Sequence, residues 1–199
     1  ASRAEAAGDG VRKWLAVHGL GLAHRMQGRF DEAADCFRRT LRVARATGDE
    51  YSVLASLIGL ASTRGRQGDG ARAAGHYRRA LELAREVGNP YWEFEAVHGL
   101  GRLACGAGRP EQAVAHFSEA LAVATKLGQP AAEIRAHDGL AHARLAMGQP
   151  GHARRHWQHA LDVFTDLGLT DLGADIDCGD RVTAPAIRGH LGDLDRLAV

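Results

Sequence analysis

Residues 90–129 read PYWEFEAVHGLGRLACGAGRPEQAVAHFSEALAVATKLGQ, and this stretch decides the fold of the chain. When the sequence is laid against itself at a shift of 40 residues, Gly19, Gly59, Gly99 and Gly139 fall into one column without a gap. Fixed periods of about 20 to 50 residues are typical of solenoids, propellers and arrays. The chain is therefore expected to consist of copies of one unit.

Further columns of the alignment define both halves of the unit. They are Leu20/Leu60/Leu100/Leu140, Gly28/Gly68/Gly108/Gly148, Phe37/Tyr77/Phe117/Trp157 and Gly48/Gly88/Gly128/Gly168. In the second half, apolar residues recur at i, i+4 and i+8, as in Ala33, Phe37 and Leu41, which indicates a helix and not a strand. Each unit is predicted to be a helical hairpin.

Glycine and proline mark where these helices end and begin. Gly108 and Pro110 place a helix stop next to a helix start, and Asn89 is a suitable N-cap before Pro90. The first helices are expected near 11–27, 51–67, 90–107 and 130–147, and the second helices near 31–47, 70–87, 110–127 and 150–167.

The run of small, aromatic, small and leucine residues at Ala113, Phe117, Ala120 and Leu121 resembles the tetratricopeptide repeat (TPR) signature, as does the turn glycine Gly108. The resemblance covers residues 11–168 and implies an all-α, right-handed α-α superhelix of four hairpins with terminal capping helices. The long unit is similar to arrays of multidomain signalling ATPases and actinobacterial antibiotic-pathway regulators. Thr40 departs from the alanine usual in its column, so packing there is expected to be less regular.

The same register divides the chain. Residues 1–10 match the tail of a preceding repeat, which predicts a larger parent protein, and 170–199 form a degenerate fifth repeat or cap, with a short helix near 170–178 and a final helix capped by Thr183. Ile187, Leu191, Leu194 and Ala198 share one face of that final helix. The four repeats between are 11–49, 50–89, 90–129 and 130–169.

In TPR arrays, one stripe of the first helices lines a concave groove, and the resemblance carries that role to matching columns of this chain. The expected groove residues are His18, Leu22, Arg25, Ile58, Ser62, Arg66, Glu95, His98, Arg102, Cys105, Asp138 and His142, with Arg135 in the same stripe. Arg25, Arg66 and Arg102 can clamp an acidic ligand, or they can form ion pairs within the protein on a solvated inner face.

Other chemistry-bearing residues have two interpretations each. The mid-helix glycines, Gly19 among them, indicate either close helix packing or a furrow for a ligand. His152, His156 and His159 share a helix face, yet surface histidines are favoured over a metal site. Asp138 and His142, one turn apart, are the best acid–base pair for an enzyme.

Composition limits the partners. A net charge of +1 and the absence of a long apolar run predict a cytoplasmic protein without direct nucleic-acid or membrane binding. We expect a non-catalytic module without cofactor or metal, and a homo-oligomer is compatible with the sequence. The favoured function is the sensor or interaction domain of a larger transcriptional regulator that binds a peptide, protein tail or metabolite. The alternatives are a free-standing scaffold and, less favoured, an enzyme on a helical-repeat scaffold.

Overall fold

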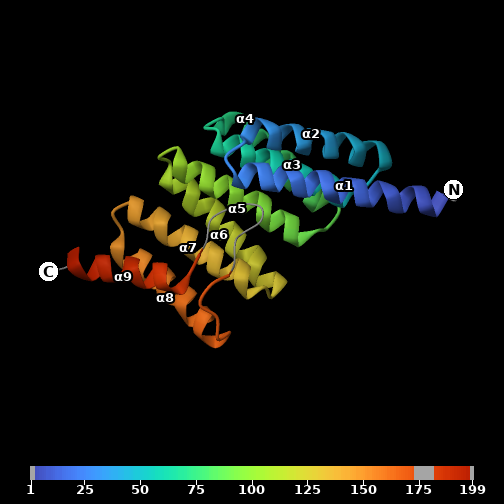
Figure 1. The fold of residues 1–199 in the computed structure, drawn as a ribbon. Coiled ribbons are helices and arrows are strands. Elements are labelled where there is room, and N and C mark those ends of the chain that lie inside the picture. Colours follow the sequence, from blue (N-terminus) through green and yellow to red (C-terminus); the bar gives the residue numbers. More distant parts are fainter. Residues whose placement is uncertain (1–2, 173–181, 198–199) are drawn as a thin grey trace. The chain divides into compact units, whose positions relative to one another are not determined.

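The computed structural model describes residues 3–172 and 182–197, and helices joined by short turns make up almost all of them (Figure 1). The all-α repeat fold predicted from the sequence is confirmed. The helices of the described part are α1 (Arg3–Met26), α2 (Phe30–Thr47), α3 (Glu50–Arg66), α4 (Gly70–Glu86), α5 (Pro90–Gly106), α6 (Pro110–Leu127), α7 (Pro130–Ala146), α8 (Pro150–Asp166) and α9 (Ala184–Leu197).

Local signals set most of these helix ends. Helices α5 to α8 each begin at a proline, whose missing N–H costs nothing in the first turn. Gly48 ends α2 in the left-handed conformation with a φ of +69°, and the Asp49 N–H then donates to the Ala44 carbonyl at 3.0 Å. The Asn89 side chain accepts a hydrogen bond from the Trp92 N–H at 3.3 Å, which confirms it as a cap.

Helix α1 differs from the expectation at its start. It begins at Arg3, so residues 3–10, which the repeat register assigns to the tail of a preceding helix, continue α1 instead. The segment Arg3–Ala7 holds strong helix formers, and a glycine such as Gly8 costs a helix only about 1 kcal/mol, which is too little to end it.

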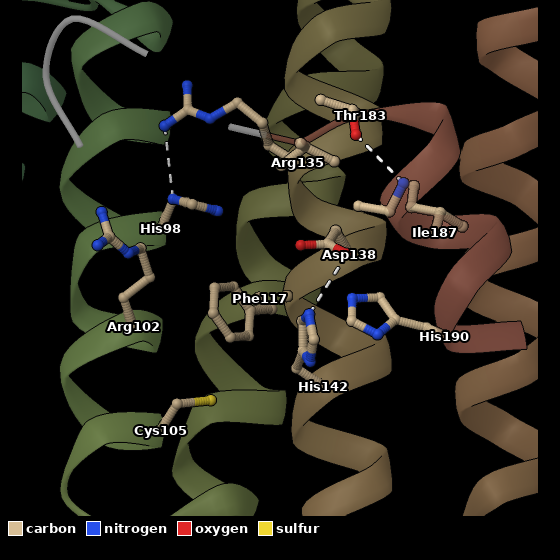
Figure 2. Close-up of a pocket in the computed structure, with 13 residues that line it drawn as sticks. His98, Arg102, Cys105, Phe117, Arg135, Asp138, His142, Thr183, Ile187 and His190 are labelled. Carbon is tan, nitrogen blue, oxygen red and sulfur yellow. Dashed lines mark hydrogen bonds and ion pairs between the residues drawn. The ribbon is translucent and has the colours of Figure 1, made fainter. Parts of the chain in front are cut away.

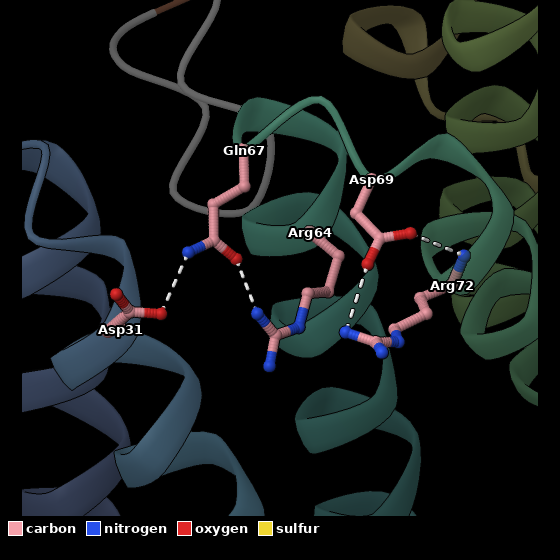
Figure 3. Close-up of polar contacts among 5 residues, drawn as sticks. All are labelled: Asp31, Arg64, Gln67, Asp69 and Arg72. Carbon is pink, nitrogen blue, oxygen red and sulfur yellow. Dashed lines mark hydrogen bonds and ion pairs between the residues drawn. The ribbon is translucent and has the colours of Figure 1, made fainter.

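The chain divides into two compact units, residues 1–92 and residues 93–199, which are described separately. In the first unit α1 packs on α2, α2 on α3 and α3 on α4, and α1 also contacts α3, so consecutive hairpins stack. Polar contacts at the turns join them (Figure 3). The Gln67 side chain donates to Asp31 at 3.0 Å and accepts from Arg64 at 2.6 Å, which ties the end of α3 to the start of α2.

In the second unit α6 packs on α7, α7 on α8 and α8 on α9. The Thr183 hydroxyl accepts the Ala186 N–H at 3.2 Å, and Ile187 and Leu194 are buried against the last repeat, as predicted for a capping helix. The short helix expected near 170–178 is not formed at 170–172, where Asp171 instead pairs with Thr183 in an isolated bridge. The rest of that segment, and Ala198, lie outside the described residues.

Each mid-helix glycine of α3 and α7 is a seat for an aromatic ring. A Cβ placed on Gly59 would lie 2.7 Å from the ring of Phe37, and one placed on Gly139 would lie 2.6 Å from the ring of Phe117. These distances are too short for any side chain. Close packing therefore explains Gly59 and Gly139, and the furrow interpretation is wrong at both.

A hydroxyl pair makes Thr40 fit its column. The Thr40 hydroxyl donates to the Phe37 carbonyl at 2.9 Å and accepts from the Ser56 hydroxyl at 2.9 Å, and both side chains are buried. In the second unit the two columns hold Ala120 and Ala136. The polar pair thus replaces an alanine pair and adds one hydrogen bond between α2 and α3.

Candidate functional pocket

A pocket of about 360 Å³ lies in the second unit and is formed by side chains of α5, α6, α7 and α9 and of the residues just before α9 (Figure 2). Five residues predicted for the groove meet there: His98, Arg102, Cys105, Asp138 and His142. Arg135, from the same stripe, also lines it. The repeat places them together because residues of one helical stripe recur on neighbouring first helices. The other lining residues are Phe117, Gly139, Val182, Thr183, Ala186, Ile187 and His190.

Helix α5 supplies the wall with His98, Arg102 and Cys105. Burial lowers the pKa of His98 well below its usual value, and the positive charges of Arg135 and Arg102 lower it further. His98 is therefore neutral near pH 7. Burial raises the pKa of the Cys105 thiol, so this cysteine is not a preformed thiolate nucleophile.

Arg135, which lines the pocket, forms a two-pronged ion pair with Glu95 of α5. Arg135 Nη1 lies 2.5 Å from Glu95 Oε1, Arg135 Nη2 lies 3.0 Å from Oε2, and Glu95 is only 1% exposed. The same guanidinium lies 4.9 Å from the Phe94 ring centroid and reaches His98 Nδ1 at 3.5 Å. Two residues of the predicted stripe thus pair with each other inside the protein.

The opposite side of the pocket is lined by Asp138, His142 and His190, and all three contact the buried indole of Trp157. Asp138 accepts the indole N–H of Trp157 at 3.0 Å and lies 3.6 Å from His142 Nε2. His190 of α9 stacks on Trp157, with ring centroids 4.8 Å apart, and meets His142 edge to face. Asp138 is therefore committed to positioning Trp157 as well as His142.

Sequence reasoning missed the contribution of α9 to the pocket. Val182, Ala186, Ile187 and His190 were assigned only to a cap, because the repeat pattern decays after Gly168 and gives no column for them. The predicted cap could have indicated this contribution. A helix that covers the last repeat takes the place of the first helix of a further repeat, and first helices line the groove.

The groove residues predicted in the first unit have different environments. Arg25 is 2% exposed and donates to the Ser62 hydroxyl, and Ile58 is buried. His18 is half-buried between Trp14 and Phe37, and burial, with Arg25, lowers its pKa to about 4. Leu22 is also half-buried. Arg66 is exposed, with its guanidinium 5.7 Å from the Phe30 ring centroid, so the three predicted clamp arginines are not equivalent.

The histidines of the fourth repeat pair with one another. His137 Nδ1 lies 3.1 Å from His156 Nδ1, and the rings of His137 and His159 stack. Burial, followed by the charges of His137 and other neighbours, lowers the pKa of His156 to about 4. Within the described residues, no group of three or more metal-ligating side chains is arranged to hold a metal ion.

Comparison with known proteins places this architecture. Residues 10–194 match the family described as the MalT-like TPR region. The chain belongs to the MalT-like TPR family. No curated protein matches this MalT-like TPR chain. In the part of it that the structure describes, no helix has the length and apolar character needed to cross a membrane.

Several solved structures resemble this MalT-like TPR chain in fold. BtubC (BKLC) from P. vanneervenii is 21% identical with a TM-score of 0.68, over 76% of this chain and 63% of that one. A signal transduction ATPase with numerous domains (STAND) from Pyrococcus horikoshii, which has a tetratricopeptide repeat sensor, is 18% identical with a TM-score of 0.67, over 78% and 24%.

A Rap protein complexed with Competence and Sporulation Factor is 16% identical with a TM-score of 0.70, over 80% of this chain and 45% of that one. At these identities the likeness shows the fold alone. The MalT-like TPR chain also spans less than two thirds of the length of each of these three structures.

Proposed function

We propose that this MalT-like TPR chain is a non-catalytic interaction module that binds an acidic segment of a peptide or protein, or an acidic metabolite, in the pocket between α5, α7 and α9. The observation that carries the proposal is the composition of the pocket wall. Among the residues that the structure describes, two arginines and three histidines line the pocket together with one carboxylate, Asp138.

The charges of the pocket favour an anion. Arg135 is paired with buried Glu95, and Asp138 accepts the Trp157 indole N–H. The guanidinium of Arg102 adds a second positive charge to the pocket lining, and a ligand carboxylate would be attracted to it. Arginine is well suited to this because its planar guanidinium binds a carboxylate through two parallel hydrogen bonds. His98, held neutral beside it, can donate or accept one more hydrogen bond.

The rest of the pocket favours an apolar group next to that carboxylate. Phe117, Val182 and Ile187 present carbon surface, and ligand pockets of roughly 300 to 1,000 Å³ usually combine such surface with few polar groups. At about 360 Å³ the pocket matches a short part of a chain or a small metabolite, and not a whole helix. The ligand class is therefore an amphipathic acid.

We place this binding in a sensor of a larger transcriptional regulator in the cytoplasm, and two structural neighbours support the choice of a sensor. One is a STAND ATPase with a repeat sensor, and the other is a Rap protein complexed with a named factor. A pocket confined to one unit fits a sensor better than a scaffold that joins two proteins by extended surfaces. The proposal needs no nucleic-acid, membrane or cofactor contact.

A peptide array tests the proposal. Each acidic nonapeptide is paired with the same sequence carrying Asn and Gln in place of Asp and Glu, and binding to the labelled chain is measured. We expect some acidic members to bind at least about 10-fold more tightly than their amide partners, since a lost charge-assisted hydrogen bond is worth about 1.5–3 kcal/mol.

Two charge-reversed variants locate the site. Arg102→Glu should lose the preference for acidic peptides, whereas Arg155→Glu, which makes the same charge change on exposed α8 surface, should keep it. Circular dichroism verifies that both variants fold. Acidic binding that survives Arg102→Glu, or an array without any acid preference, would rule out this pocket as a binding site for acidic peptides.

A further inference from the structure

The joint between consecutive hairpins is built the same way in both units. The ring of Phe37 on α2 lies against Gly59 of the next hairpin and Gly21 of its own, and the ring of Phe117 on α6 lies against Gly139 and Gly101. A Cβ on any of these four glycines would lie 3.0 Å or less from the ring. Each ring is thus enclosed by two helices, and the glycine of the following hairpin is its seat.

Gly19 belongs to the same column as Gly59 and Gly139, but its seat is empty. A Cβ placed on Gly19 would meet no atom of the described part of the chain within 4 Å. Its neighbour Leu20 is 49% exposed, whereas Leu60 and Leu140, in the equivalent positions, are each 2% exposed. Leu15 on the same helix is also exposed. Helix α1 therefore has, on an exposed face, the same residue types that are buried in the joints of the later repeats.

We propose that this face of α1, centred on Gly19, Leu15 and Leu20, is a docking surface for a helical hairpin of the same repeat type. The second helix of that hairpin would place an aromatic ring on Gly19 as α2 places Phe37 on Gly59. The occupant follows from continuity with the joints already present, in which an aromatic ring of one hairpin lies on the equivalent glycine of the next hairpin.

A second copy of this chain does not provide the ring. The aromatic residues of the joint column are all buried in their own hairpins, and Trp157, at the last repeat, is covered by His190 of α9. No member of this column can therefore reach Gly19 of another molecule without unpacking its own joint. The docking hairpin comes from outside these four repeats.

A fused hairpin tests the proposal directly. A copy of residues 10–49 is placed immediately before residue 10 of the chain, which keeps the 40-residue register, and amide hydrogen exchange is followed in residues 14–26. Covering α1 should slow exchange there by at least about 10-fold relative to the unfused chain and raise Tm. The matched control carries Phe37→Ala only in the added copy, and it should lose most of that protection.

A larger residue at the seat gives a second measurement. Gly19→Leu should leave the Tm of the unfused chain unchanged or higher because space is open there, but it should remove the protection in the fused protein. Three results would overturn the proposal: no added protection in the fusion, equal protection with the Phe37→Ala copy, or a dimer of the unfused chain that Gly19→Leu dissociates in sedimentation.

Discussion

The indole N–H of Trp157 donates to Asp138 across 3.0 Å, which joins the aromatic ring of the last hairpin to a residue of the pocket wall. Equivalent pairs occupy the same two columns in other repeats, where the rings of His18 and Phe37 lie 5.1 Å apart and those of His98 and Phe117 lie 5.3 Å apart. In each of these three repeats, the first-helix residue of this column thus contacts the aromatic ring on the second helix of the same hairpin.

This relationship predicts the effect of Asp138→Ala. The indole N–H of fully buried Trp157 would lose its acceptor, and we expect a loss of about 1–3 kcal/mol in the free energy of unfolding, measured by urea denaturation. Asp138→Asn, which keeps an acceptor oxygen, should lose less. In a Trp157→Phe background, Asp138→Ala should cost less than in the wild type because no indole N–H remains, and an equal loss in the two backgrounds would contradict the hydrogen bond as its cause.

Breaking the Glu95–Arg135 pair should be costly. Either Glu95→Ala or Arg135→Ala leaves one charge buried without its main partner, and we expect about 3–5 kcal/mol of destabilisation in each. Replacing both by apolar residues, as in Glu95→Leu with Arg135→Met, should be much milder because no buried charge remains. If the double variant is as unstable as the sum of the singles, the two side chains do not act as a pair.

The Thr40–Ser56 hydrogen bond is suited to a double-mutant cycle. Thr40→Ala and Ser56→Ala should each cost about 1–2 kcal/mol, because the remaining hydroxyl is buried with one partner fewer. The double variant should cost less than the sum, since the equivalent columns of the second unit hold Ala120 and Ala136. Additive losses in chemical denaturation would show that the hydroxyls are not coupled.

Stability should fall as the pH drops from about 6.5 to about 4. The pKa of His18 and that of His156 are each lowered to about 4 in the folded protein, so over this range the unfolded chain binds more protons than the folded one. The contribution of each neutral imidazole is complete above pH 6.5 and is lost on the way down to its folded pKa.

Thermal denaturation by circular dichroism from pH 7.5 to pH 4.5 measures this slope. His156→Gln should flatten it, because glutamine does not titrate, and His116→Gln, at the equivalent position of α6, is the control for the loss of an imidazole elsewhere. A slope that is the same in the wild type and in His156→Gln would assign the acid sensitivity to other groups.

The sequence predicted the helices well because their ends are set by nearby residues. Pro110 and Pro130 begin helices and Gly48 ends one through their own backbone limits, so no tertiary knowledge was needed. At Gly8, by contrast, the same letters that end α2 do not end α1. A glycine alone is therefore not enough to predict that a helix ends.

The pocket was predicted in part for the same reason. His98, Arg102 and Asp138 follow from the periodic stripe, but Arg25, in the same stripe, is buried against Ser62. The position in the stripe predicts the face of the helix from which a side chain projects. It does not predict which residues of other helices contact that side chain. The contribution of His190 depends on how α9 packs, which no repeat column records.

The ring-and-glycine joint also bears on how such a chain lengthens. Phe37 and Gly59 are separated along the sequence by the same interval as Phe117 and Gly139, and each pair spans a boundary between neighbouring hairpins. A duplication of one period, wherever its cut points fall, therefore restores one ring and one seat at every new boundary. A repeat that is added by duplication therefore already carries the ring and the glycine that its new neighbours need. The number of repeats can change during evolution while every joint between hairpins is kept.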